Sequence, residues 1–490
     1  MQIRSQIRTL TRESLVYGLP GVLSGFIGVL MAPIYTRVFS TAEFGLVSLV
    51  NVFGALVSSF VVLSLDNSAA RWFYDTEDPD HRRATISSWF WCQLLVGTLF
   101  ATCIIGISPF ISQQLLGTSE HAYLFCLTAI GIPFHTGSKV FASTLRYQRQ
   151  AKLAVLMTIS QILANVGLVL LFIVILRQGV QGLFVAQLLC TLGMGCIGFV
   201  GVRSWVSPRM FSWERLRAML KYALPLIPAA IAVWMMTGVD RIMLGKLTNT
   251  SEVGLYSVSA AIAGGVALIT SAFGQAWGPF AFSIIAQPES KRVYAKVLEL
   301  YSFLGCGLCA VLGVFAPLIL RVIATENYYP AASTVGPLAL CVLLNSSRNI
   351  GVIGCGIAKK SVPTAYSIAI GAGLTVVFNL CLIPLFGRNG AAIGTASAWA
   401  GSVVYLFWVS QKNYPIPYRW KFALAPLCLS IAILVITYLL GEPESIWDYI
   451  ARGSMLLAFV PLGMIMGMLN RSQMQAFFFN RDRSPEGLSL

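Results

Sequence analysis

The chain alternates between long apolar runs and short polar segments. Read with a window of about 19 residues, each run is long enough to cross a ~30 Å hydrocarbon layer as a helix. The strands of a membrane barrel would instead give segments of about ten residues with alternating polarity. We therefore predict fourteen transmembrane helices, at residues 14–38, 43–67, 86–108, 120–146, 152–176, 179–201, 222–246, 253–280, 298–320, 331–356, 362–385, 389–410, 422–440 and 447–469.

Composition supports an all-α integral membrane protein. Hydrophobic residues occupy 57% of the 490 positions and charged residues only 11%, whereas roughly 25% of an average soluble domain is charged. The first apolar run is too long for the core of a cleaved signal peptide and lacks a small-residue cleavage site, so we expect it to remain as the first helix. Cys306 and Cys309 form a C-x-x-C on an apolar helix without a nearby His or carboxylate, and we expect packing thiols there, with no metal and no cofactor.

Basic residues gather in every second loop and thereby predict the orientation. The intervening loops contribute only Arg177, Lys246, Arg321 and Arg388. Because Lys and Arg accumulate on the cytoplasmic side, both termini are predicted to be cytoplasmic. The net charge of +15 is then a topology signal, and no loop is long enough to form a nucleic-acid-binding face. The basic groups are Arg4, Arg8 and Arg12; Arg71, Arg82 and Arg83; Arg146, Arg149 and Lys152; Arg203, Arg209, Arg215, Arg217 and Lys221; Lys291, Arg292 and Lys296; Lys359 and Lys360; Lys412, Arg419 and Lys421; and Arg471, Arg481 and Arg483.

Short motifs recur at an offset of about 205 to 209 residues. "YGLPGVLSGF" at Tyr17 corresponds to "YALPLIPAAI" at Tyr222, "FGLVSLV" at Phe44 to "VGLYSVS" at Val253, and "GVQGLFVAQ" at Gly179 to "GRNGAAIGT" at Gly387. Because each half has six helices, an even number, both halves begin on the same side of the membrane and the repeat is parallel. Transporters with such a repeat bind substrate between the halves.

The repeat divides the chain into two six-helix lobes and an appendix. We predict an N-terminal lobe over 1–203, a cytoplasmic linker over 204–221 and a C-terminal lobe over 222–411. An additional helix pair covers 412–470, and a cytoplasmic tail covers 471–490.

Four cations inside the apolar runs form two pairs related by the same offset. Arg37 corresponds to Arg241 near the outer ends of their helices, and Lys139 corresponds to Arg348 at greater depth. Arg37 and Arg241 could also snorkel to the outer head groups. A deeper charge costs at least a few kcal/mol, so Lys139 and Arg348 should face the bundle interior or a water-filled cavity. The alternative for this pair is a structural role, with hydrogen bonds to backbone carbonyl groups within the bundle.

A cationic cavity between two lobes predicts an anionic cargo. The planar guanidinium binds two phosphate oxygens at once, so phosphate or pyrophosphate suits these residues. His135, one helical turn from Lys139, could join the site or carry a proton, with a packed core histidine as the alternative. Two acids accompany the cations. Asp66 corresponds to Gln275 in the second half, whereas Asp240, adjacent to Arg241, corresponds to Thr36.

Several longer motifs resemble the polysaccharide-transport branch of the MATE-like MOP superfamily, the Wzx-type O-antigen and exopolysaccharide flippases. They are "APIYTRVFSTAEFGLVSLV", "LDNSAARWFYD" followed by "HRRATISS", "VDRIMLG" followed by "SEVGLYSVS", "GIAKKSVPTA" and "LIPLFGRNGAAIGTA". The likeness covers most of the chain and is weakest after about residue 415.

The resemblance implies a flippase of the bacterial inner membrane. Such a protein would move an undecaprenyl-pyrophosphate-linked oligosaccharide to the outer leaflet, coupled to H⁺ or Na⁺. Its partners would be the lipid-linked oligosaccharide, membrane lipids, and a polysaccharide polymerase or other assembly proteins. Its fold would comprise 12 to 14 helices in two lobes around a central cavity.

Within that mechanism the charged and aromatic residues acquire candidate roles. The pyrophosphate would bind Lys139 and Arg348 first, and then Arg37 and Arg241 as the cavity opens outward. Asp66 is the candidate coupling carboxylate, with an ion pair to Arg71 as its alternative. Asp240 either tunes Arg241 through another helix or takes part in ion coupling. The candidates for stacking on sugars, with anchoring at the membrane interface as their alternative, are Trp89, Trp234 and Trp277.

Two other functions compete with this prediction. A MATE-type multidrug or metabolite antiporter of the same superfamily would favour an acidic cavity, whereas bases outnumber acids within these helices. A glycan polymerase or ligase would need a large outer loop with catalytic residues, and the outer loops are short. No nucleotide-binding G-x-x-x-x-G-K-[ST] sequence occurs, so we expect a transporter and not an enzyme.

Overall fold

The computed structural model describes residues 20–21, 23–28 and 30–467, and these residues form helices and short connections without a strand. The predicted basic residues at both ends, from Arg4 to Arg12 and from Arg471 to Arg483, lie outside the described residues. The predicted all-helical membrane fold is confirmed.

The elements follow one another as two sets joined by a linker. An apolar helix over Leu23–Val38 comes first and runs over a residue that is not described. The rest of the first set is α2 (Thr41–Val62), α3 (Leu65–Tyr74), α4 (Pro79–Leu116), α5 (Ala122–Tyr147), α6 (Ala151–Leu170), the π-helical turn η1 (Leu171–Ile175) and α7 (Gly179–Val202). The linker holds η2 (Pro208–Met210), α8 (Trp213–Ala223) and η3 (Leu224–Leu226). The second set is α9 (Ile227–Leu247), α10 (Thr250–Ala263), α11 (Gly265–Ser283), α12 (Ser290–Ile323), η4 (Glu326–Ala331), α13 (Ala332–Ile357), α14 (Val362–Asn413), α15 (Trp420–Leu439), α16 (Ile446–Met455), η5 (Leu456–Ala458) and α17 (Phe459–Ile465).

Within the described ranges, eleven helices are long and apolar enough to span a membrane, or twelve when α10 and α11 count as one broken span. These two helices meet at Gly264 with a 45° bend. Helix α14 has 52 residues, about 78 Å at the helical rise and more than twice the hydrocarbon thickness. It contains a break at Gly387, where φ is 54°, so it holds two of the predicted spans. The predicted total of fourteen stays a prediction.

Local sequence signals explain several helix ends. Ser40 caps α2 and forms a reciprocal capping box with Glu43. Gly117, with φ of 76°, ends α4 in the left-handed conformation that glycine adopts without strain. Arg419 binds both carboxylate oxygens of the buried Glu299 and thereby fixes the start of α15 on α12. The predicted additional helix pair is thus anchored to the second set.

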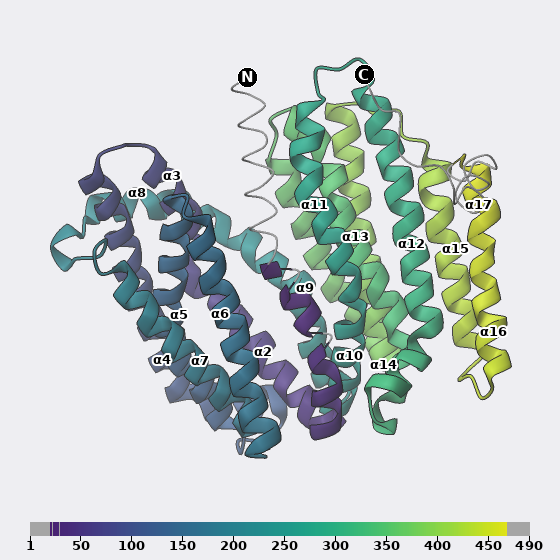
Figure 1. Cartoon of the computed structure of the whole chain (residues 1–490), viewed down its shortest axis with the longest axis horizontal. Coiled ribbons are helices and arrows are strands. Elements are labelled where there is room, and N and C mark those ends of the chain that lie inside the picture. The colour runs from purple at the N-terminus through teal and green to yellow at the C-terminus, as the bar shows by residue number, and fades with distance from the viewer. Residues whose placement is uncertain (1–19, 22, 29, 468–490) are drawn as a thin grey trace, which may run out of the picture.

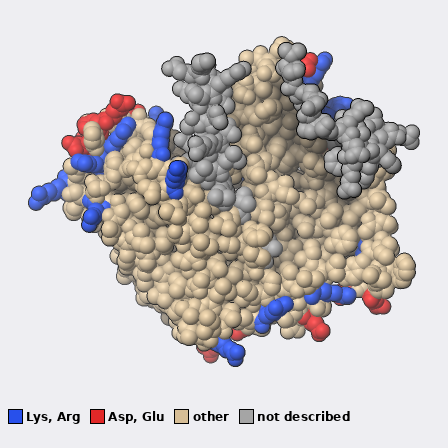
Figure 2. Space-filling model, in the orientation of Figure 1, with Lys and Arg blue, Asp and Glu red and all other residues tan. Residues whose placement is uncertain are grey.

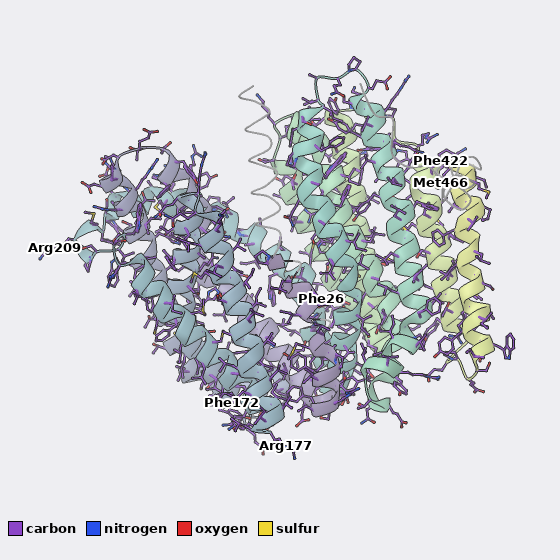
Figure 3. All side chains as sticks on the ribbon, in the orientation of Figure 1. Phe26, Phe172, Arg177, Arg209, Phe422 and Met466 are labelled. Carbon is purple, nitrogen blue, oxygen red and sulfur yellow. The ribbon has the colours of Figure 1, made fainter. Side chains whose placement is uncertain are left out.

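The two sets diverge toward one edge of the molecule and meet at the other (Figure 1). Arg209 and Met466 lie on the diverging side, and Arg177 lies at the opposite edge (Figure 3). Arg209 belongs to a loop predicted to be cytoplasmic and Arg177 to a loop predicted to be outer, so the diverging side is the predicted cytoplasmic side. Figure 2 shows a broad band of uncharged surface between charged groups at these two edges, as expected of a membrane-spanning surface.

The two sets are joined near the edge that is predicted to be outer, called the outer edge below, by a reciprocal contact between α2 and α10. A Cβ atom on Gly45 would overlap the carbonyl oxygen of Thr250, and one on Gly254 would overlap the carbonyl oxygen of Thr41. One turn further, Ser257 donates a hydrogen bond to Ser48, with 2.7 Å between the hydroxyl oxygens. The members of each pair are separated by the repeat offset, so the recurring motifs contact each other as a local two-fold axis requires. The residue boundaries of the predicted lobes stay predictions.

Further bonds close the same edge. Thr36 donates to the carbonyl oxygen of Ile323 at 2.9 Å, and Thr325 donates back to the carbonyl oxygen of Thr36 at 3.1 Å. Tyr328 donates to the carbonyl oxygen of Phe39 at 3.0 Å. The two sets therefore contact each other tightly at the outer edge, in the conformation expected of a molecule closed on that side.

Cysteines at positions 48 and 257 should report this contact directly. We expect Ser48→Cys/Ser257→Cys to form an intramolecular disulfide under mild oxidation, because the two hydroxyl oxygens are within hydrogen-bonding distance. Cleavage at a protease site inserted in the linker would leave the two halves joined on a non-reducing gel. Adding Gly45→Leu should suppress the cross-link, since any side chain there displaces α10.

Gly106→Leu is the matched control, because no neighbouring atom lies within 4 Å of a Cβ at Gly106. It should leave the cross-link unchanged. Halves that separate in the oxidised double-cysteine protein, or equal loss of the cross-link with both leucines, would contradict the α2–α10 contact.

Candidate functional site

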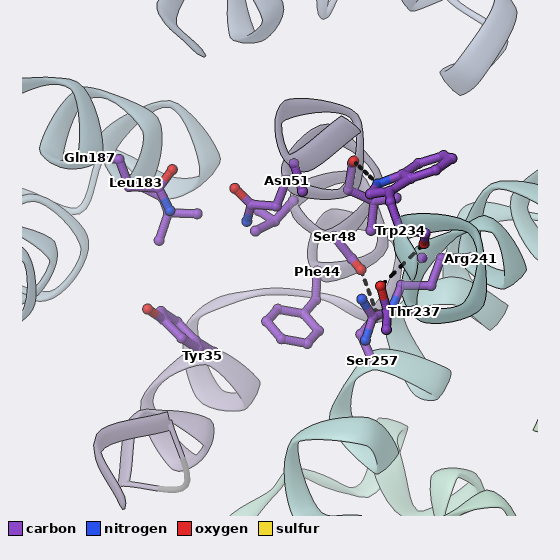
Figure 4. Close-up of a pocket in the computed structure, with 14 residues that line it drawn as sticks. Tyr35, Phe44, Ser48, Asn51, Leu183, Gln187, Trp234, Thr237, Arg241 and Ser257 are labelled. Atoms are coloured by element: carbon purple, nitrogen blue, oxygen red, sulfur yellow. Dashed lines mark hydrogen bonds between the residues drawn. The ribbon is translucent and has the colours of Figure 1, made fainter. Parts of the chain in front are cut away.

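A cavity of about 330 Å³ lies between the two halves just inside the outer contact. Helices α2 and α7 line it from the first half, and α9 and α10 line it from the second. Figure 4 shows Asn51 and Gln187 on one side of this cavity and Trp234 and Arg241 on the other. No acidic residue is among those that line it. The predicted position of a binding site, between the halves, thus coincides with a cavity containing a cation.

Arg241 contributes that cation from α9. Its guanidinium Nε is buried without a hydrogen-bond partner in the described structure. The neighbouring carboxylate of Asp240 accepts from the backbone N–H of Arg241 at 2.8 Å, and no ion pair joins the two side chains among the described residues. Arg241 therefore keeps an uncompensated charge beside the cavity.

The three predicted stacking tryptophans differ in their surroundings. Trp234 lines the inter-half cavity and donates from Nε1 to the carbonyl oxygen of Val52 at 3.2 Å, so it also bridges the halves. Trp89 is fully buried among core residues of the first half. Trp277 is 3% exposed and donates to the carbonyl oxygen of Asn349. In this conformation only Trp234 of the three presents a ring to a cavity described here.

Arg348 lines a second cavity, of about 490 Å³, formed by α11, α13 and α14. Its charged group lies 5.7 Å from the ring centroid of Trp399, and its Nε is buried without a hydrogen-bond partner in the described ranges. The other polar residues that line this cavity are neutral: Thr270, Ser271, Gln275, Asn345, Ser346, Asn349 and Thr364. Arg348 is thus a second cation without a carboxylate partner.

Lys139 has an acidic partner, unlike Arg348. Its Nζ lies 3.4 Å from the carboxylate of Asp66. Leu63 and Ser64 take positive φ values and separate α3 from α2, which places Asp66 in the first turn of α3, where a carboxylate is favoured by the helix dipole. Arg71, the alternative partner of Asp66, instead lies 5.1 Å from the ring centroid of Tyr222.

The repeat makes this difference between the halves informative. The equivalent of the Lys139–Asp66 pair is Arg348 with Gln275, and these two residues line the same cavity. The second half thus retains the cation and replaces its acid by an amide. The predicted joint site of Lys139 and Arg348 is not formed by any described contact in this conformation.

Two further predicted residues have exposed side chains. Arg37 lies near the outer end of the first helix and His135 on α5. Neither has a side-chain hydrogen bond or ion pair to another described residue. Their predicted roles stay predictions.

Asp240 points away from the inter-half cavity, into the second half. It is 5% exposed and accepts hydrogen bonds from the hydroxyls of Tyr256 and Thr395. Asn379 donates weakly to Thr395 at 3.5 Å, and its own carbonyl oxygen Oδ1 is buried without a partner in the described structure. Asp240 is therefore a buried carboxylate among neutral oxygen groups, and it forms no ion pair with a cationic side chain of the described residues.

A third cavity, of about 640 Å³, was not anticipated from the sequence. It lies between the first helix, α2, α6 and α7, and its lining contains four side-chain amides, those of Asn51, Gln161, Asn165 and Gln187. The sequence signal for this cavity is the presence of polar amides inside apolar runs, which is weaker than the signal of a charged residue. Within the described ranges, no group of three or more His, Cys, Asp or Glu is placed to hold a metal ion.

A family model described as "Polysaccharide biosynthesis protein" matches residues 34–333, more than half of the chain. Among curated proteins, the chain is 24% identical over 401 residues to the probable flippase AglR of Haloferax volcanii, covering 78% of this chain and 80% of that protein. It is 26% identical over 238 residues to the succinoglycan biosynthesis transport protein ExoT of Rhizobium meliloti, covering 46% of this chain and 44% of that protein.

Solved structures show the same fold at low sequence identity. The lipid II flippase MurJ in an inward closed conformation has a TM-score of 0.70 at 13% identity, covering 92% of this chain and 98% of that chain. An inward-facing multidrug resistance MATE transporter of the MOP superfamily has a TM-score of 0.61 at 15% identity, covering 80% and 97%. The chain belongs to the polysaccharide biosynthesis protein family.

Proposed function

We propose that this protein is a flippase that moves a lipid-linked oligosaccharide across the cytoplasmic membrane by alternating access. The head group would be a pyrophosphate and the lipid a polyprenol such as undecaprenol. Membership of the family and the relatives' printed roles as flippase and transport protein support this proposal. The inner-membrane location, the cytoplasmic termini and an assembly partner such as a polymerase belong to the same proposal.

The observation that carries the proposal is the pair of uncompensated arginines. Arg241 and Arg348 each line a cavity without an acidic residue, and each has a buried Nε without a partner in the described structure. A buried charge is expensive unless a counter-ion neutralises it. An anionic head group would supply that counter-ion, and a guanidinium binds phosphate oxygens in a bidentate manner.

The two arginines lie at different depths, which suits a transported anion. Arg348 is about 13 Å along the helix from the end of α13 at Ile357, the predicted cytoplasmic end. Arg241 is about 9 Å from the end of α9 at Leu247, the predicted outer end. The head group would bind Arg348 from the diverging side and reach Arg241 as the outer contact opens. The polyprenyl chain would remain in the bilayer between the two sets of helices.

A MATE-type multidrug antiporter remains the competing function, because solved MATE structures share the fold. A cationic drug would need an accessible carboxylate in the cavity. Asp66 is paired with Lys139, and Asp240 is hydrogen-bonded within the second half. The charges on the cavity walls therefore favour an anionic cargo.

We also propose that Asp240 couples transport to an ion gradient. A carboxylate that is 5% exposed needs either a proton or a cation to offset the cost of burial. The hydroxyl oxygens of Tyr256 and Thr395 and the free Oδ1 of Asn379 are the oxygen ligands that Na⁺, a hard cation, would use. Asp66 is less suited to this role because Lys139 already neutralises it.

Replacing either arginine by glutamine should strongly reduce flipping. We expect Arg241→Gln and Arg348→Gln each to lower the rate by roughly 10- to 100-fold, because each removes charge-assisted bonds worth about 1.5–3 kcal/mol. The measurement is translocation of a polyprenyl-pyrophosphate-linked oligosaccharide in proteoliposomes. Arg241→Lys should retain part of the activity, since it keeps the charge but not the bidentate geometry.

Arg217→Gln on the exposed face of α8 is the charge-matched control and should transport normally. If both cavity variants transport at the wild-type rate, the anion site is wrongly placed. Gradient-driven uptake of cationic dyes together with no flipping by the wild-type protein would favour the antiporter.

Asp240→Asn should abolish the response of transport to an ion gradient. Proteoliposomes with an imposed pH gradient or an imposed Na⁺ gradient would show which ion accelerates the wild-type protein. We expect that acceleration to be absent in Asp240→Asn, whereas head-group binding to the detergent-solubilised variant should remain within about twofold of wild type. Asp66→Asn is the comparison, and an equal loss of gradient response in that variant alone would assign coupling to Asp66.

A further inference from the structure

The third cavity differs chemically from the two that contain arginine. It belongs almost entirely to the first half, and its polar lining consists of neutral groups, the four amides with the hydroxyls of Ser24, Thr158 and Thr191. Neither an acidic nor a basic residue is among its lining residues. Such a surface has no charge with which to hold a phosphate, but it offers many hydrogen-bond donors and acceptors.

The four amides are not used to hold the helices together. Asn and Gln inside a membrane commonly hydrogen-bond across helix interfaces. Here, no hydrogen bond joins the side-chain amide of Asn51, Gln161, Asn165 or Gln187 to another described residue. The hydroxyls of Thr158 and Thr191, in contrast, donate hydrogen bonds to backbone carbonyl oxygens one turn earlier in their own helices. The amides are thus available to a polar occupant of the cavity.

The repeat shows that the fold itself does not need these amides. The turns before α6 and before α14 each contain a residue with positive φ, Arg149 at 58° and Lys359 at 56°. With these turns aligned, Gln161 corresponds to Gly371 and Asn165 to Thr375. The motif pair at Phe44 and Val253 aligns Asn51 with Ala260, and the motif pair at Gly179 and Gly387 aligns Gln187 with Thr395, so neither position has an amide in the second half.

The amide cavity adjoins the inter-half cavity. Asn51 and Gln187 line both of them, and Figure 4 shows these two side chains facing the space opposite Arg241. A ligand whose anionic group contacts Arg241 could therefore extend neutral polar groups into the first half. The 640 Å³ of the amide cavity is within the range of small-molecule sites.

We propose that Asn51, Gln161, Asn165 and Gln187 form a carbohydrate-binding subsite for the glycan of the transported lipid. A side-chain amide both donates and accepts hydrogen bonds, which matches sugar hydroxyls that also do both. This inference rests on the proposed flippase function and adds a division of roles. The arginines of the second half bind the anionic head group, and the amides of the first half bind the sugar nearest to it.

The test compares three ligands on purified, detergent-solubilised full-length protein by native mass spectrometry. They are lipid-linked oligosaccharide extracted from the host membrane, bare polyprenyl pyrophosphate, and free oligosaccharide released by mild acid. We expect Gln161→Leu/Asn165→Leu to bind the glycosylated lipid at least about tenfold more weakly, because several hydrogen bonds are lost. Its affinity for bare polyprenyl pyrophosphate should be unchanged. Arg241→Gln should lose affinity for both lipids.

Gln181→Leu is the matched control, because it makes the same chemical change on exposed α7 surface outside the cavity. Should the double variant fail to fold, Asn165→Leu and Gln187→Leu singly provide the same comparison. Unchanged binding of the glycosylated lipid by folded amide variants would overturn the carbohydrate subsite. If Arg241→Gln lost binding in the same experiment, the flippase proposal would still stand. A wild-type protein that binds neither lipid would overturn both.

Discussion

The close approach of α2 and α10 is the contact on which the arrangement of the two halves depends. Gly45 and Gly254 bring the helix backbones together at the outer edge, and each glycine faces the carbonyl oxygen of the opposite helix start. Small residues allow such packing in a membrane, where apolar side chains gain little by leaving lipid for protein. Because the two glycines are equivalent positions of the repeat, one short motif provides both surfaces. Large side chains pack around this contact, because Leu49 of α2 lies in one core cluster with Val253 and Tyr256 of α10, and Phe44 packs against Tyr328.

Charge is the second constraint, since each ion inside a membrane must be neutralised or used. The molecule treats its intramembrane ions in different ways. Lys139 and Asp66 neutralise each other, and Asp240 is surrounded by hydroxyls. Among the described cations of the spans, only Arg241 and Arg348 both line a cavity and have a buried Nε atom without a hydrogen bond. Because Gln275 stands in the second half where the first half has Asp66, Arg348 lacks the acidic partner that Lys139 has.

Much of the fold could be predicted because hydropathy and the positive-inside pattern report membrane insertion, which acts on each helix separately. The repeat paired the motifs that contain Gly45 and Gly254 as equivalents, but their contact with each other was not predicted. Two of the predicted site residues, Arg241 and Trp234, line the inter-half cavity. The features that the sequence did not predict depend on local backbone geometry and on which helices pack against each other. Leu63 and Ser64 take positive φ although neither is a glycine. Their identity therefore did not predict the break between α2 and α3 that brings Asp66 to Lys139. The burial of Trp89 and Trp277 and the inward direction of Asp240 likewise follow from packing between distant helices.

The two halves show how a duplicated fold acquires an asymmetric function. Equivalent positions keep the glycines and serines that hold the halves together, and diverge where side chains face cavities. The first half has amides where the second has small or hydroxyl-bearing residues, and the second has an unpaired arginine where the first has an ion pair. A symmetric cavity would present the same chemistry on both walls, whereas a lipid-linked glycan has a charged end beside a neutral, hydroxyl-rich end. The divergence of the walls therefore matches the polarity of such a ligand, while the contact between α2 and α10 remains symmetric.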